Sequence, residues 1–266
     1  MADVALRMIR DARRSLAWWT VGVVALVWVN VIFYPSVRDS PEIEGFVEDS
    51  PELMRALLGG RESLDILSPA GYLDGQVFAL LVPLLLLIFA IGHGAGAIAG
   101  EEERGTLELL LANPVGRHRL VAEKLLGLLG LVALFAAVTW LSSWTSGLAV
   151  DLGVSAGRML AATLAAGLLG GLFGVLALLT GAATGRRGPA IGVPAALAVA
   201  AYLLMALAPL ADWLKPWRVL SPFYYYASYD RLVDGMDWGA AGVLALVTAV
   251  LAGAAVLAFE RRDLKL

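Results

Sequence analysis

The sequence contains no cysteine and only two histidines, His93 and His118. A chain without cysteine can form neither a disulfide framework nor a thiolate metal site, and two histidines are too few for a histidine-rich metal site. Charged residues are also scarce: 16% of the 266 residues are charged, whereas 59% are hydrophobic. The mean hydropathy of +0.77 lies well above that of soluble globular domains. The composition therefore predicts an integral membrane protein.

The motifs of common hydrolytic and nucleotide-binding sites are missing too. There is no HExxH, no GxSxG with a plausible histidine partner, and no pair of carboxylates inside an apolar run. No Walker A sequence occurs, so this chain does not bind ATP through a P-loop. These absences disfavour an intramembrane enzyme.

Six apolar runs are long enough to cross a bilayer as helices. They cover residues 16–34, 76–99, 125–148, 159–184, 189–210 and 238–259. We therefore predict an all-α fold in which residues 1–266 form a single transmembrane domain of six helices. None of the six runs contains Asp, Glu, Lys or Arg, whereas ion-coupled pumps normally need ionisable groups at membrane depth. If the protein moves a substrate uphill, another protein must supply the energy.

The segments between the runs differ in character. Residues 1–15 form a basic amphipathic arm, which we expect to lie on the cytoplasmic leaflet. Its basic residues are Arg7, Arg10, Arg13 and Arg14. Residues 36–75 are polar and acidic and predict an outer loop, in which prolines and glycines frame a short helix. Residues 211–237 are rich in Trp and Tyr but broken by prolines, which predicts short re-entrant helices in the outer leaflet.

Six spans place both ends of the chain on one side of the membrane. Of the 20 Lys and Arg residues, thirteen fall on that side and seven on the other. By the positive-inside rule, both termini are predicted to be cytoplasmic.

The loop at residues 100–119, GEEERGTLELLLANPVGRHR, is the sizeable charged connection on this side. Glu101–Glu103 suit the first turn of a helix, where the helix dipole is positive, and their simplest interpretation is a solvated helix start. A leucine stripe follows at i, i+3 and i+4, and a proline ends it. Its leucines are Leu107, Leu110 and Leu111. The stripe fits either an interfacial helix in the lipid headgroups or a helix docked in the groove of a partner protein.

A few polar residues lie inside the apolar runs and are candidates to line a substrate pathway. They are Asn30, His93, Ser142 and Ser143. The same residue types commonly form hydrogen bonds between membrane helices, which is the simpler interpretation of each. The fourth run contains GLLGGLFG, whose overlapping GxxxG pairs Gly167/Gly171 and Gly170/Gly174 predict close contact with a neighbouring helix.

The order of these parts resembles the membrane subunit of ABC-2-type transporters. The most similar stretch has an acidic cluster, a Gly-Thr-Leu-Glu and a Pro-x-x-Arg before the third span. In this sequence these are Glu101–Glu103, Gly105–Thr106–Leu107–Glu108, and Pro114 with Arg117. The pieces SPAGYL and SPFYYY, at 68–73 and 221–226, are similar to the actinobacterial branch of multidrug or polyketide-antibiotic exporters.

The resemblance implies an assembly of two six-span subunits, paired through spans one and five, with two cytoplasmic P-loop ATPases that bind ATP and Mg. The loop would be the coupling helix that sits in the ATPase groove, and the four arm arginines would make a second contact. The glycine-rich inner end of span two would take up the bend during transport. The coupling residues are Glu101, Glu102, Glu103, Gly105, Thr106, Leu107, Glu108, Leu110, Leu111, Pro114 and Arg117.

We therefore expect the permease subunit of an ATP-driven exporter in a bacterial inner membrane, which moves a hydrophobic or amphiphilic substrate out of the cytoplasm. The chain itself is expected to be no enzyme, to hold no cofactor and to bind no nucleic acid. Its expected partners are the ATPase, a second copy of itself and the lipid membrane. The alternative is a membrane scaffold that recruits a cytoplasmic partner without transport.

Overall fold

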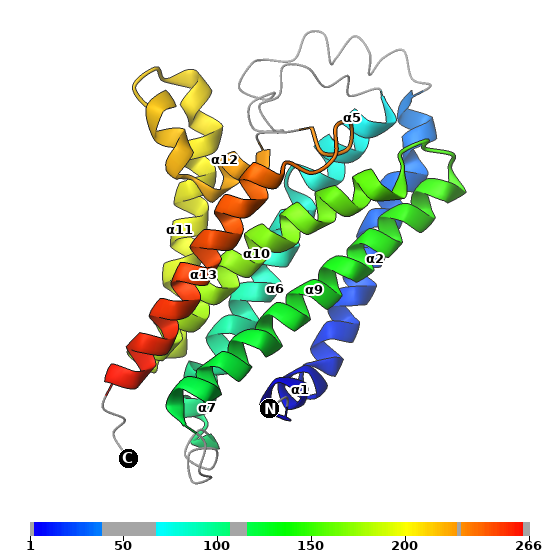
Figure 1. Ribbon diagram of the computed structural model, residues 1–266. Coiled ribbons are helices and arrows are strands. Elements are labelled where there is room, and N and C mark those ends of the chain that lie inside the picture. Colours follow the sequence, from blue (N-terminus) through cyan, green and yellow to red (C-terminus); the bar gives the residue numbers. More distant parts are fainter. Residues whose placement is uncertain (1–2, 39–67, 107–115, 228–229, 263–266) are drawn as a thin grey trace.

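A computed structural model describes residues 3–38, 68–106, 116–227 and 230–262. These residues are helical with short turns, and no strand occurs among them (Figure 1). Within the described ranges, six helices are long and apolar enough to cross a membrane. They cover Arg13–Ser36, Pro69–Ala97, Arg117–Ala149, Ala156–Thr184, Arg187–Leu210 and Trp238–Arg261. The predicted all-α fold with six spans is confirmed.

The helices follow one another with few long connections in the described ranges. In chain order they are α1 (Asp3–Asp11), α2 (Arg13–Arg38), α5 (Pro69–Leu73), the π-helix η1 (Asp74–Phe78), α6 (Leu81–Ala97), α7 (Ala99–Glu103), α9 (Arg117–Ala149), α10 (Ala156–Thr184), α11 (Arg187–Leu207), the 3₁₀ helices η2 (Ala208–Leu210) and η3 (Lys215–Leu220), α12 (Pro222–Ala227) and α13 (Trp238–Arg261). We call the end of the bundle that carries α1, α7 and the last turn of α13 the α7 end. The opposite end, with α5 and α12, is the α12 end (Figure 1).

Helix α10 lies at the centre of the bundle and packs against α6, α9, α11 and α13. Its apolar window is 72% buried, compared with 17% for α2 and for α13. The overlapping GxxxG pairs face two different helices. A Cβ at Gly174 would lie 2.9 Å from Ala90 of α6, and one at Gly167 would lie 3.3 Å from Ala136 of α9. The small residues thus let two neighbours approach one helix closely.

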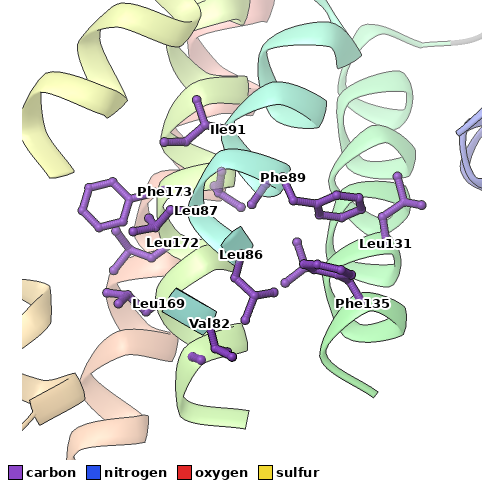
Figure 2. Packing of buried hydrophobic residues seen from close by; sticks show 14 of the residues in the cluster. Val82, Leu86, Leu87, Phe89, Ile91, Leu131, Phe135, Leu169, Leu172 and Phe173 are labelled. Carbon is purple, nitrogen blue, oxygen red and sulfur yellow. The ribbon is translucent and has the colours of Figure 1, made fainter. Parts of the chain in front are cut away.

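Aromatic rings join α6 to its other neighbours. Phe89 of α6 stacks on Phe135 of α9 with 4.7 Å between ring centroids, and Trp19 of α2 meets both rings edge-on. Figure 2 shows Phe89 and Phe135 on one side of α6 and Leu172 and Phe173 of α10 on the other. The buried side of α6 therefore ties α2, α9 and α10 into one core.

Two helices begin earlier than the apolar runs indicate. Helix α9 begins at Arg117, eight residues before the predicted limit at Leu125, and α5 begins at Pro69 inside the predicted 36–75 loop. The early start of α9 brings Glu123 and Lys124 into the helix, where both are buried. The hydropathy of the sequence excludes these two charged residues from the predicted span, because hydropathy takes no account of the groups that pair with them in the fold.

The second span bends at two places near those that the sequence indicates. The chain breaks at η1 and at Leu80, before Pro83, and Pro83 lies in the first turn of α6, where its missing donor costs no helical bond. At the glycine-rich end, α6 stops at Ala97 and Ile98 separates it from α7. Gly94 packs so closely that a Cβ there would lie 2.2 Å from the carbonyl oxygen of Gly174. Close backbone packing at this end is therefore observed.

Residues 211–227 and 230–237 carry short helices and turns, as the proline breaks predict. Two buried hydroxyls tie the middle of this segment to the bundle. Ser221 Oγ donates to the carbonyl of Ala201 at 2.7 Å, and Tyr226 Oη donates to that of Phe78 at 2.5 Å. Trp213 and Trp217 remain exposed. This is the arrangement of an aromatic segment at the surface of a membrane bundle.

Candidate functional site

The three consecutive glutamates of α7 reach three different partners. Successive residues of an α-helix point about 100° apart, so Glu101, Glu102 and Glu103 fan out around the short helix. Helix α7 lies at one end of the bundle and follows α6 directly in the chain (Figure 1). Each carboxylate therefore meets a different long helix or its terminus.

Glu101 forms an ion pair with Lys124 of α9. The lysine side chain is 4% exposed and the glutamate side chain 20%. A charge this deeply buried is tolerated because a partner of opposite sign and a hydrogen bond replace its hydration. The pair fixes α7 to the second turn of α9.

Glu102 forms a bidentate pair with Arg262, the residue that follows the last turn of α13. Arg262 Nη1 donates to Glu102 Oε2 at 3.0 Å, and Nη2 donates to Oε1. Nη1 also lies 3.3 Å from the carbonyl oxygen of Ala182 in α10. Arginine suits this site because its planar fork matches a carboxylate with two parallel hydrogen bonds.

Gly185 makes room for this pair. It ends α10 in the left-handed conformation with φ +66°, which glycine adopts without steric cost. A Cβ at this position would lie 2.0 Å from Arg262 Nη2 and 2.7 Å from Glu102 Oε1. Both the backbone and the space around it therefore require glycine here.

Glu103 and Arg117 extend the network. Glu103 Oε1 accepts a hydrogen bond of 2.8 Å from the backbone N–H of Arg187, the first residue of α11, where a carboxylate also favours the positive end of the helix dipole. Arg117, the first residue of α9, donates from Nη1 to the carbonyl of Arg262 at 3.1 Å. The interpretation of Glu101–Glu103 as a solvated helix start is thus wrong for Glu101 and Glu102, which are half-buried and paired.

The N-terminal arm α1 lies against α9. Glu123 accepts hydrogen bonds from the backbone N–H of Val4 at 3.0 Å and from Nε of Arg119 at 3.1 Å. A Cβ at Gly127 would lie 3.0 Å from the sulfur of Met8, so the absence of a side chain lets the arm approach. The arm therefore covers protein with its apolar face. The four arginines predicted for the arm are exposed; Arg7 and Arg10 belong to α1, and Arg13 and Arg14 begin α2.

The structure describes part of the predicted coupling loop. Gly105 adopts φ +68° after the C-terminal end of α7, and the hydroxyl of Thr106 donates to the carbonyl of Glu101 at 3.1 Å. The leucine stripe lies outside the described residues and stays a prediction. The residues concerned are Leu107, Glu108, Leu110, Leu111 and Pro114. Arg117, on the far side of the loop, belongs to α9.

The predicted pathway residues are not brought together. Asn30 Nδ2 bonds to the carbonyl of Leu26, the His93 ring to that of Phe89, and Ser143 Oγ to that of Thr139, each at 2.8 Å and four residues back in its own helix. The hydroxyl of Ser142 is buried without a hydrogen-bond partner in the described part of the chain. The bonds seen for the first three thus lie within a helix, a common habit of polar side chains in apolar helices.

An apolar groove of about 580 Å³ runs between α9, α10 and α13. Small residues form much of its wall, and its polar groups are confined to Trp140, Thr163 and Thr248. The Trp140 indole already donates to the carbonyl of Ala156 at 3.0 Å. The groove suits a hydrocarbon chain or another apolar molecule.

Sequence reasoning missed four residues of the α7 end. They are Glu123, Lys124, Gly185 and Arg262. The signal for Glu123 and Lys124 was a pair of charges directly before an apolar run. Gly185 was visible as a glycine between a span and two arginines, which is typical of a helix C-terminus. No local signal marks Arg262, because its carboxylate partner is 160 positions away in the sequence.

A family model described as "ABC-2 family transporter protein" matches residues 3–264. A search of curated proteins finds no match for the chain. The matched range contains all six apolar helices, the arm, and both sides of residues 107–115.

Proposed function

Because this chain belongs to the ABC-2 family of transporter proteins, we propose that it is the permease subunit of an ATP-driven exporter that works with a separate cytoplasmic ATPase. Membership of the family and six apolar helices make it a multi-pass membrane protein of a transporter. The sequence has no Walker A motif, so ATP and Mg belong to the partner. The excess of Lys and Arg supports a cytoplasmic location of the α7 end, and the membrane proposed is the inner membrane of a bacterial cell.

The observation that carries the proposal is the anchoring of residues 107–115 at both sides. The helix before them is fixed by Glu101 and Glu102, and the helix after them begins with Arg117, which bonds to Arg262. A segment that receives a push from an ATPase transmits it only if its ends are held by the bundle. The predicted leucine stripe then docks in the ATPase groove, in the helix-in-groove mode.

The remaining features support export of an apolar or amphiphilic substrate through a pair of subunits. The groove between α9, α10 and α13 is apolar, and no ionisable group lines it. Helices α2, α11 and α13 are the first, fifth and sixth spans, and their apolar windows are 17%, 22% and 17% buried. The resemblance to the family implies pairing through the first and fifth. Such open apolar faces supply a surface for a second copy of the chain.

The test is co-purification of the full chain with its P-loop ATPase. Changing Leu107 and Leu110 together to Asp should abolish retention of the ATPase, because two charges cannot enter an apolar groove. As a control, Leu210 and Leu220, which are exposed at the α12 end, are changed to Asp and should leave retention intact. Equal retention by both double variants would refute the docking assignment. Retention without ATP-dependent substrate movement would favour the scaffold instead.

A further inference from the structure

Resting on this proposed function, we propose that α7 is an ionic latch that makes the cytoplasmic ends of α9 and α13 move together when the ATPase pushes on residues 107–115. The latch consists of three contacts. They are Glu101 with Lys124, Glu102 with Arg262, and Glu103 with the backbone N–H of Arg187. These are positioning residues: they touch no substrate and act on the helices that do.

The first argument is that one residue binds both sides of the coupling segment. Glu102 lies before residues 107–115 and pairs with the Arg262 guanidinium, whereas Arg117 lies after them and donates to the Arg262 carbonyl. The end of α13 is therefore attached to both entry and exit of the loop. A displacement of the loop pulls α13 along unless one of these contacts breaks.

The second argument is burial. Exposed ion pairs contribute little, because water screens them and the side chains lose entropy on pairing. Here the side chains of Lys124 and Arg262 are 4% and 19% exposed, and those of Glu101 and Glu102 are 20% and 28% exposed. Separating such a pair leaves a charge without hydration, so the contacts hold through small movements. Glu103, which is exposed, is the weakest of the three.

The third argument is that the surroundings admit one arrangement of the pair. Gly185 leaves the space that the Arg262 guanidinium and the Glu102 carboxylate occupy, and the Ala182 carbonyl accepts a further hydrogen bond from the guanidinium. Four helices thus meet around one arginine: α7, α9, α10 and α13. Packed elements of this kind shift between discrete positions instead of deforming continuously.

The experiment uses the complete complex with its ATPase in lipid nanodiscs. Because the chain has no cysteine, single reporters can be introduced as Ala122→Cys on α9 and, in a separate sample, Arg261→Cys on α13, both at exposed positions. The rate of maleimide labelling is compared between the nucleotide-free complex and the complex trapped with Mg-ATP and vanadate. Trapping should change the rate at both positions in the parent protein.

The latch predicts that Arg262→Gln separates the two reporters. The change in labelling rate at position 122 on trapping should persist, whereas the change at position 261 should become about tenfold smaller. A factor of about ten is typical of the coupling between two sites in a protein. Glu102→Gln, which keeps the shape of the side chain, should have the same effect, and Arg262→Lys, which keeps the positive charge, should retain more of the response than Arg262→Gln. Arg186→Gln, an exposed arginine at the same end, serves as the matched control.

Unchanged responses at both positions in Arg262→Gln and Glu102→Gln overturn the latch and leave the proposed function intact. Failure of the parent chain to retain an ATPase overturns the proposed function itself, and the latch proposal falls with it. Loss of both responses together, with the ATPase still bound, also contradicts the latch, because α9 is attached to the loop directly.

Discussion

The two ends of the bundle are held together by different chemistry. At the α7 end, charged groups pair between helices that are far apart in sequence, such as Glu102 and Arg262. At the α12 end, hydroxyls donate to backbone carbonyls, as Tyr226 does to Phe78, and the buried Arg231 lies over the Tyr226 ring. The ion pair Asp212–Lys215 at this end is exposed and joins residues three positions apart. An ionic end with long-range pairs suits a part that receives force from a soluble partner. An end of aromatic side chains and hydroxyls suits a part that rests against lipid headgroups.

The largest expected effect is at the buried lysine of the α7 end. Lys124→Met leaves Glu101 as a buried charge without its partner and should destabilise the protein by about 3–5 kcal/mol. The measurement is thermal or denaturant unfolding of the purified chain in detergent. Adding Glu101→Gln should recover most of the loss, since no uncompensated charge remains. Equal stability of the single and double variants would contradict the assigned pair.

A second prediction compares a glycine at each end. Gly185 and Gly235 both have positive φ, +66° and +92°, but a Cβ meets Arg262 at Gly185 and open space at Gly235. Gly235→Ala should cost about 1 kcal/mol through backbone strain alone. Gly185→Ala should cost about 2–4 kcal/mol, because overpacking adds to the strain. The same unfolding measurement gives both values, and equal costs would remove the evidence that Gly185 makes room for the latch.

A third prediction concerns the hydroxyl of Tyr226 at the α12 end. Tyr226→Phe removes the donor to the carbonyl of Phe78 and should destabilise by about 1–1.5 kcal/mol. Tyr224→Phe is the neighbouring control on the same short helix and should change stability by less than about 0.5 kcal/mol. If the two variants are indistinguishable, the segment is held by ring packing and not by the hydrogen bond.

The smallest effect is expected at the exposed pair of the α12 end. The hydrogen bond from Lys215 to the Asp212 carboxylate lowers the pKa of Asp212 below the usual value for an aspartate. A lowered pKa in the folded state stabilises the protein above the ordinary range of aspartate titration, and this stabilisation is lost as the pH falls. Lys215→Ala should therefore change the unfolding temperature slightly at neutral pH and not at all in strong acid. A large difference at pH 7 would show that this end also depends on its charges.

Much of the fold was predictable because apolar runs and proline breaks are local signals. The six spans, the broken segment before α13 and the close packing at Gly94 and Gly174 all follow from residues near one another in sequence. The limits of α9 were not predictable in this way, because Glu123 and Lys124 look unfavourable in a membrane helix until their partners Val4 and Glu101 are known.

The candidate site was predictable by position but not by mechanism. The acidic cluster predicts where α7 lies, but not which residues its carboxylates contact. Two of the partners, Arg262 and Arg187, are 160 and 84 positions away in sequence from the carboxylates that they bind. The arm arginines are exposed, as the amphipathic pattern predicts, whereas the apolar face of the arm meets α9, with Gly127 beneath Met8. Contacts between residues so far apart in sequence depend on how the helices pack, and a local sequence pattern does not predict that packing.

The most direct test of the account places a photo-reactive crosslinker on Leu110→Cys in membranes that contain the complete transporter. We predict a crosslinked product with the P-loop ATPase, because the proposed docking places the leucine stripe in the groove of that protein. Crosslinks to lipid alone, with the ATPase present, would contradict the account, since the stripe would then be an interfacial helix that receives no push.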